Sequence, residues 1–78
     1  MGMKLSACPA KRLAQVTGVD IGPGVLMRAR ELGIAPGRFL RVTQRSIFGG
    51  TVVDVAGTRL ALDRATTERI DVEFAEEQ

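Results

Sequence analysis

The chain has 78 residues, which is enough for one domain over residues 1–78 and leaves no room for a second. A chain this short buries a small core, so we expect a shallow functional site and no deep substrate cavity. Its formal net charge is +2, but residues 1–45 carry eight Lys/Arg against two Asp/Glu, whereas residues 46–78 carry three against seven. The fold decides whether this asymmetry produces a basic face.

The residue types that most catalytic and metal sites need are scarce. The sequence contains no histidine, which removes the usual general base near neutral pH and the commonest transition-metal ligand. The single cysteine, Cys8, cannot form an intramolecular disulfide, which favours a reducing compartment and predicts a cytoplasmic protein. There is no phosphate-binding glycine motif. We therefore expect a binding protein with no catalytic residue, no cofactor and no metal site.

The first half of the chain predicts a strand, a helix and a second strand. Apolar and polar side chains alternate imperfectly over residues 11–19, which we interpret as a strand. Residues 23–33 form a short amphipathic helix that begins at a proline and ends at a glycine. Its expected packing stripe consists of Val25, Ala29 and Leu32. Residues 35–38 have the Pro-Gly centre of a type II turn, and residues 40–45 follow as a half-buried strand in which Gln44 shares a face with Leu40 and Val42.

The second half predicts a glycine-rich hairpin tip at 46–50 and two further strands at 51–55 and 59–63. Four residues of these strands should share the core face: Val53, Val55, Leu60 and Leu62. One helical turn is expected near residues 65–68, and residues 70–74 alternate as a closing strand. Because about five short strands with one helix favour a closed sheet, we predict a mostly β fold, a small SH3-like barrel with its core over about residues 11–74. An OB-like barrel remains the alternative.

Three stretches together resemble the FeoA family, ferrous iron transport protein A. Residues 28–37 are Arg-Ala-Arg-Glu-Leu-Gly-Ile-Ala-Pro-Gly, residues 53–62 are Val-Asp-Val-Ala-Gly-Thr-Arg-Leu-Ala-Leu, and residues 70–72 are Ile-Asp-Val. The resemblance covers about residues 11–73. It departs at Ala29, where the family usually has Leu, and at Thr67, where it usually has Ala. Both are expected to be packing positions.

The resemblance implies an SH3-like barrel in the bacterial cytoplasm that assists ferrous iron uptake. Its partner would be the cytosolic GTP-binding portion of the membrane transporter FeoB, which it would modulate without hydrolysing anything itself. Similarity to the C-terminal barrel of iron-dependent repressors leaves a metal-responsive regulatory role as an alternative. A nucleic-acid-binding barrel is a third possibility, and its contacts would come from Lys11, Arg12, Arg41 and Arg45.

The predicted partner-binding surface combines the helix with the hairpin tip. Leu26 and Met27 fall outside the expected packing stripe, so at least one of them should be exposed as an apolar anchor. Phe48 is expected either to tuck under the tip or to face the partner. The predicted contact residues are Val25, Leu26, Met27, Arg28, Ile47 and Phe48.

Overall fold

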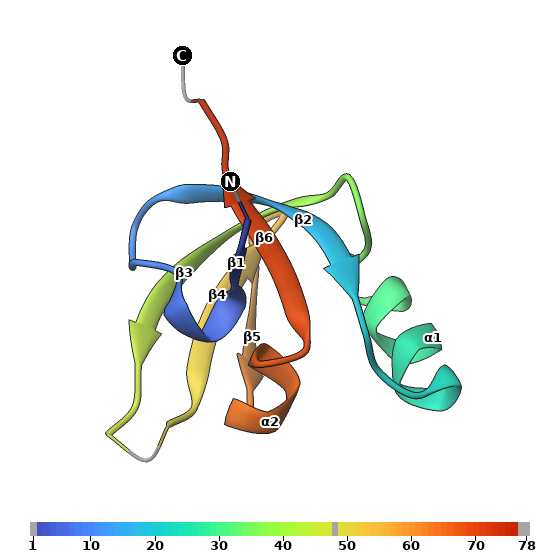
Figure 1. The fold of residues 1–78 in the computed structure, drawn as a ribbon. Helices are drawn as coiled ribbons and strands as arrows, with labels where there is room; N and C mark the ends of the chain where they lie inside the picture. The colour runs from blue at the N-terminus through green and yellow to red at the C-terminus, as the bar shows by residue number, and fades with distance from the viewer. Residues whose placement is uncertain (1, 48, 77–78) are drawn as a thin grey trace.

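The computed structural model describes residues 2–47 and 49–76, and within them it forms one six-stranded antiparallel sheet with two short α-helices (Figure 1). The elements in chain order are β1 (Met3–Lys4), the 3-10 helix η1 (Leu5–Ala7), β2 (Leu13–Val19), α1 (Pro23–Glu31), β3 (Phe39–Arg45), β4 (Thr51–Val55), β5 (Thr58–Leu62), α2 (Arg64–Thr67) and β6 (Ile70–Phe74). The strand order is β1-β6-β2-β3-β4-β5. The mostly β prediction is confirmed. The strand that sequence reasoning missed is β1, because two residues are too few to show a period of two.

One core lies inside the curled sheet, and every strand from β2 to β6 contributes to it. Its fully buried members include Val16 of β2, Val42 of β3, Val53 of β4 and Val72 of β6. The segment that follows β1 adds Leu5 and Cys8, both with no exposed surface. The N-terminal segment is therefore part of the core.

The turn at residues 35–38 forms as predicted. Gly37 has a φ of 91°, the left-handed region that a type II turn requires at its third position. The Arg38 amide donates to the Ala35 carbonyl at 3.0 Å. The Gly37 amide also donates to the Val16 carbonyl, and the Val16 amide donates to the Arg38 carbonyl, each at 2.8 Å. These bonds fix the start of β3 against β2.

The predicted face of β3 is wrong beyond its middle. Leu40 and Val42 are buried as expected, but Gln44 is exposed. The register against β4 shifts between Val42 and Gln44, which marks a bulge. Because one extra residue reverses the alternation of side chains, Gln44 turns outward and Arg45 turns toward the N-terminal segment.

The β4–β5 hairpin confirms the predicted core face. A two-residue turn at Ala56 and Gly57 has φ values of 52° and 86°, as in the type I′ turns that suit two-residue hairpins. Val53 pairs with Leu60, and both pack on the core side. All four predicted side chains point toward the core, but they are buried to different extents. Val53 and Val55 are buried, whereas Leu60 and Leu62, on the edge strand, are partly buried.

The helix is shorter and more exposed than predicted. It ends at Glu31, and Gly33, with a φ of 96°, closes it in a Schellman motif: the Ile34 amide donates to the Ala29 carbonyl at 2.8 Å and the Gly33 amide donates to the Arg30 carbonyl at 3.0 Å. The predicted packing stripe is wrong at both ends. Ala29 is buried, but Val25 is 55% exposed and Leu32 is 47% exposed.

The reason lies in how α1 is attached to the sheet. Figure 1 shows the helix beside the sheet rather than across its face. Its close contact is at the C-terminal end, where a Cβ on Gly33 would come within 2.9 Å of the Val55 side chain. Ala29 and Ile34 are buried at this same end. The middle and N-terminal turns of α1 consequently keep apolar side chains in solvent.

Candidate interaction surfaces

The helical half of the predicted surface is exposed. Met27 is 66% exposed, and Val25 and Arg28 are also exposed, whereas Leu26 is half-buried. The prediction that at least one of Leu26 and Met27 would be exposed is confirmed for Met27. These side chains lie on the part of α1 that does not contact the core.

The hairpin half lies elsewhere on the molecule. Ile47 is 94% exposed at the tip between β3 and β4, and Phe48 lies outside the described residues. Figure 1 places this tip and α1 on opposite sides of the molecule, with α2 between them. The structure therefore brings the helical residues together and leaves Ile47 apart from them. Partner binding by either half stays a prediction.

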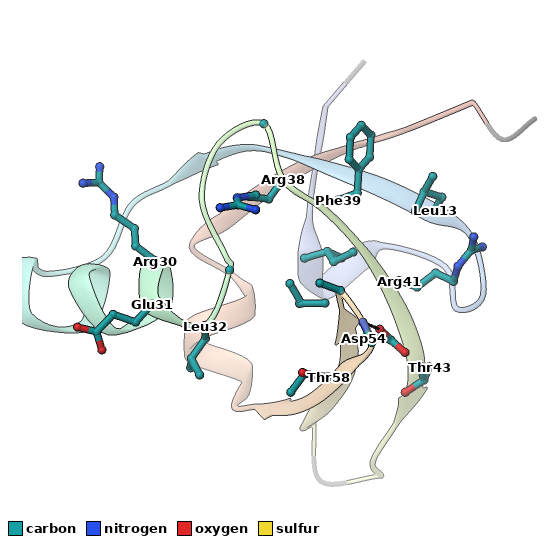
Figure 2. A pocket seen from close by; sticks show the side chains of 16 residues that line it. Leu13, Arg30, Glu31, Leu32, Arg38, Phe39, Arg41, Thr43, Asp54 and Thr58 are labelled. Carbon is teal, nitrogen blue, oxygen red and sulfur yellow. Dashed lines mark hydrogen bonds between the residues drawn. The ribbon is translucent and has the colours of Figure 1, made fainter.

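The structure contains a groove of about 870 Å³ that the sequence did not predict. Its walls are the C-terminal end of α1, the loop that leads into β3, the outer face of β3 and the β4–β5 turn (Figure 2). Leu13, Leu32 and Phe39 supply apolar lining, and Phe39 is 50% exposed. The sequence feature that could have indicated this groove is the presence of two apolar residues, Leu13 and Phe39, on the outward-facing side of β2 and β3.

The groove is charged along its edges. The arginines that line it are Arg30, Arg38 and Arg41, and the carboxylates are Glu31 and Asp54. The Asp54 carboxylate accepts a hydrogen bond of 2.9 Å from the Gly57 amide in the hairpin turn. Arg41 donates to the Lys11 carbonyl at 3.0 Å. The lining therefore combines apolar surface with basic groups from the first half of the chain.

The basic residues considered for nucleic-acid binding are used largely within the protein. The Arg12 guanidinium stacks 3.7 Å from the centre of the Phe74 ring. Arg45 donates to the carbonyls of Leu5 and Cys8 and, at 3.1 Å, to the Thr51 hydroxyl. These contacts give the two guanidinium groups structural roles.

The described residues offer little redox or metal chemistry. Within residues 2–47 and 49–76, no three His, Cys, Asp or Glu side chains are grouped closely enough to hold a metal ion. Burial raises the pKa of the Cys8 thiol, and the positive charges of Arg45 and Arg12 oppose that rise. Because Cys8 has no exposed surface, its thiol is a core group in this structure.

No helix in these ranges is long and apolar enough to span a membrane.

A small SH3-like β domain with exposed apolar side chains is therefore the class of protein that this fold defines. The FeoA domain model matches residues 3–74, and the chain belongs to the FeoA family, whose members are non-catalytic accessory proteins associated with ferrous iron transport. No curated protein matches the sequence. The two departures predicted to be packing positions are both buried, since Ala29 is 8% exposed and Thr67 has no exposed surface.

Solved structures of other proteins support the same fold. The FeoA protein of Chlorobium tepidum is 33% identical, with a TM-score of 0.87 over 95% of this chain and 71% of that chain. The FeoA protein of Stenotrophomonas maltophilia, an SH3 domain protein in complex with zinc, is 32% identical, with a TM-score of 0.75 over 91% of this chain and 89% of that chain. A manganese-dependent transcriptional repressor is 26% identical with a TM-score of 0.83, and this chain spans 37% of its length. The predicted SH3-like fold is confirmed.

Proposed function

We propose that this protein is a single-domain cytoplasmic accessory factor of ferrous iron uptake that binds the cytosolic GTP-binding portion of the FeoB transporter and modulates it. Membership of the FeoA family supports a role in the Feo system. The FeoA protein of Stenotrophomonas maltophilia is described as possibly a ferrous iron transport activating factor, which is consistent with this role. Family membership does not identify the contact surface, so that part of the proposal rests on the geometry of α1.

The observation that carries the proposal is the exposure of α1. Of its nine residues, Ala29 is the buried one, while Val25 and Met27 are more than half exposed. A small domain gains stability by covering such side chains, and an exposed methionine adapts its shape to a partner surface. Arg28 adds a positive charge beside them. We infer that the exposed part of α1 contacts the transporter.

The test is a binding measurement with the purified cytosolic portion of FeoB and the full-length protein, read by biolayer interferometry. We expect a Val25→Asp/Met27→Asp variant to weaken binding by about tenfold or more, because each substitution places a carboxylate in an apolar contact. Both side chains are exposed, so the fold should survive the change. Circular dichroism checks that it does.

Two further variants locate the contact. Ala61→Asp introduces a single carboxylate at an exposed position on β5, and we expect it to bind like the wild type. Ile47→Asp tests the hairpin tip separately, because the tip lies away from α1. Unchanged affinity in the helix variant would remove α1 from the interface, and a wild-type protein that does not bind at all would overturn the proposed partner.

A further inference from the structure

The groove between the end of α1 and the β4–β5 turn has an apolar and basic lining that the proposed function does not use. We propose that it binds an extended acidic segment of a partner protein that carries a bulky apolar side chain. The inference concerns the chemistry of the ligand, so it stands whether or not the iron transporter supplies that segment.

The apolar part of the groove is the first reason. Leu32 is 47% exposed and Phe39 is 50% exposed, and the two side chains come from different elements that meet at one hollow. Leu13 lies beside Phe39 in Figure 2 and extends the same surface. Water-exposed aromatic and aliphatic side chains that converge in a concavity are typical of sites that receive an apolar side chain.

The arginines are the second reason. The Arg38 side chain makes no hydrogen bond or ion pair within the described ranges, and in Figure 2 it extends across the groove between α1 and Phe39. Arg30 lies at the α1 end of the groove, where its side chain extends away from Phe39 and has no ion pair within the described ranges. Two guanidinium groups without carboxylate partners lie on the α1 side of Phe39, where they complement an acidic ligand.

Glu31 and Asp54 also lie along the groove, so the carboxylates of a ligand must lie beside the arginines and away from these two groups. The hollow is open to solvent, since Leu32 and Phe39 in its lining are about half exposed, and its residues come from several elements (Figure 2). A small molecule would leave much of its surface in water there. An extended peptide can place an apolar side chain against Phe39 and a carboxylate near Arg38.

The experiment titrates the isotope-labelled full-length protein with a defined probe and follows backbone amide signals by NMR. The probe is a twelve-residue capped peptide in which glutamates flank a central leucine and phenylalanine. Its counterpart carries lysine in place of every glutamate. We expect the acidic peptide to bind with a dissociation constant below about 1 mM, more weakly as salt rises, and to shift the amides of residues 30–41 and 54–58. We expect no saturable shift with the lysine peptide.

Variants separate the apolar contribution to peptide binding from the electrostatic one. We expect Phe39→Ser to weaken binding by about tenfold and Arg38→Glu to weaken it by about threefold or more. Arg59→Glu makes the same charge reversal at an exposed position that does not line the groove, and it should bind like the wild type. If Phe39→Ser loses its fold, Arg38→Glu still decides the outcome.

Three results would overturn the proposal. One is the absence of binding by the acidic peptide, and another is equal binding by the lysine peptide. The third is self-association of the protein that Phe39→Ser abolishes, because the groove would then receive a second copy of this chain. Failure of FeoB to bind, with intact peptide binding, would overturn the proposed function and leave this inference standing.

Discussion

At the scale of single residues, Arg45 connects the N-terminal segment to the sheet. Its guanidinium donates to the carbonyls of Leu5 and Cys8 and to the hydroxyl of Thr51, which is 1% exposed. Neither carbonyl sits in a regular strand ladder; the Leu5 carbonyl also accepts from the Cys8 amide at 3.1 Å, and Arg45 supplies a donor to both carbonyls. Arg45 reaches this position because the β3 bulge reverses its direction. A residue that sequence reasoning considered for nucleic-acid binding therefore has a structural function.

We expect Arg45→Ala to lower the free energy of unfolding by about 1–3 kcal/mol, because it removes the hydrogen bonds of Arg45 to three part-buried oxygens. Arg45→Lys should recover part of this loss, since an ammonium keeps the charge but cannot form the same fork of bonds. Urea unfolding followed by circular dichroism measures both changes. The control is Arg59→Ala, an exposed arginine on β5, for which we expect a change within about 0.5 kcal/mol. Equal stabilities for the two alanine variants would contradict the structural role.

At the scale of elements, α1 depends on one close approach at its C-terminal end. Gly33 combines a φ of 96° with a position where a Cβ would lie 2.9 Å from the Val55 side chain. Both the backbone conformation and the space therefore favour glycine at this position. The Schellman bonds to the carbonyls of Ala29 and Arg30 depend on the same conformation. The groove shares this junction, since Leu32 and Gly33 line it.

We expect Gly33→Ala to destabilise the protein by about 1–3 kcal/mol, through left-handed strain and the contact with Val55. The matched control is Gly24→Ala within α1, where a Cβ would meet nothing within 4 Å. We expect that control to be neutral or to stabilise by up to about 1 kcal/mol, because alanine favours the helix. Thermal and urea unfolding measure both variants. A Gly33→Ala protein as stable as the Gly24→Ala protein would contradict this account of the junction.

At the scale of the whole molecule, the sheet brings the basic and acidic halves of the chain together. β6, from the acidic half, pairs with β1 and β2 from the basic half. An ion pair of 2.8 Å between Lys4 and Asp71 crosses the β1–β6 ladder. Arg12 stacks on Phe74 beside the same strand. The charge asymmetry along the sequence is thus partly neutralised in space, and the groove keeps a share of the positive charge.

The N-terminal segment closes the core, so the Cys8 thiol reports on opening of that segment as well as on unfolding of the whole domain. Cys8 has no exposed surface, and burial raises the pKa of its thiol, so less reactive thiolate is present in the folded protein. We expect a thiol reagent at pH 8 to label the native protein on the order of a hundredfold or more slower than the denatured protein. Arg45→Ala should label faster than Arg59→Ala, because it releases the segment that covers the thiol. Native labelling at the rate of the denatured chain would show that Cys8 is accessible.

The sequence by itself determined most of the β framework, because alternation and turn chemistry are local. The Pro-Gly turn at 35–38, the hairpin at 51–62 and the closing strand at 70–74 all follow from residues close together in the chain. The FeoA resemblance also came from local motifs and is confirmed by the family match. The glycine that ends the helix was placed correctly for the same reason, since its conformation is a property of its own backbone.

Only the tertiary structure decided which surfaces remain open. The bulge in β3 depends on pairing with β4, so Gln44 and Arg45 point in directions that alternation could not predict. The exposure of Val25 and Leu32 depends on where α1 attaches, and helical periodicity contains no information about that. The groove exists because Leu32 and Phe39, seven positions apart, meet Asp54 of a distant strand. Binding surfaces of this kind arise from packing between elements, which a local pattern does not encode.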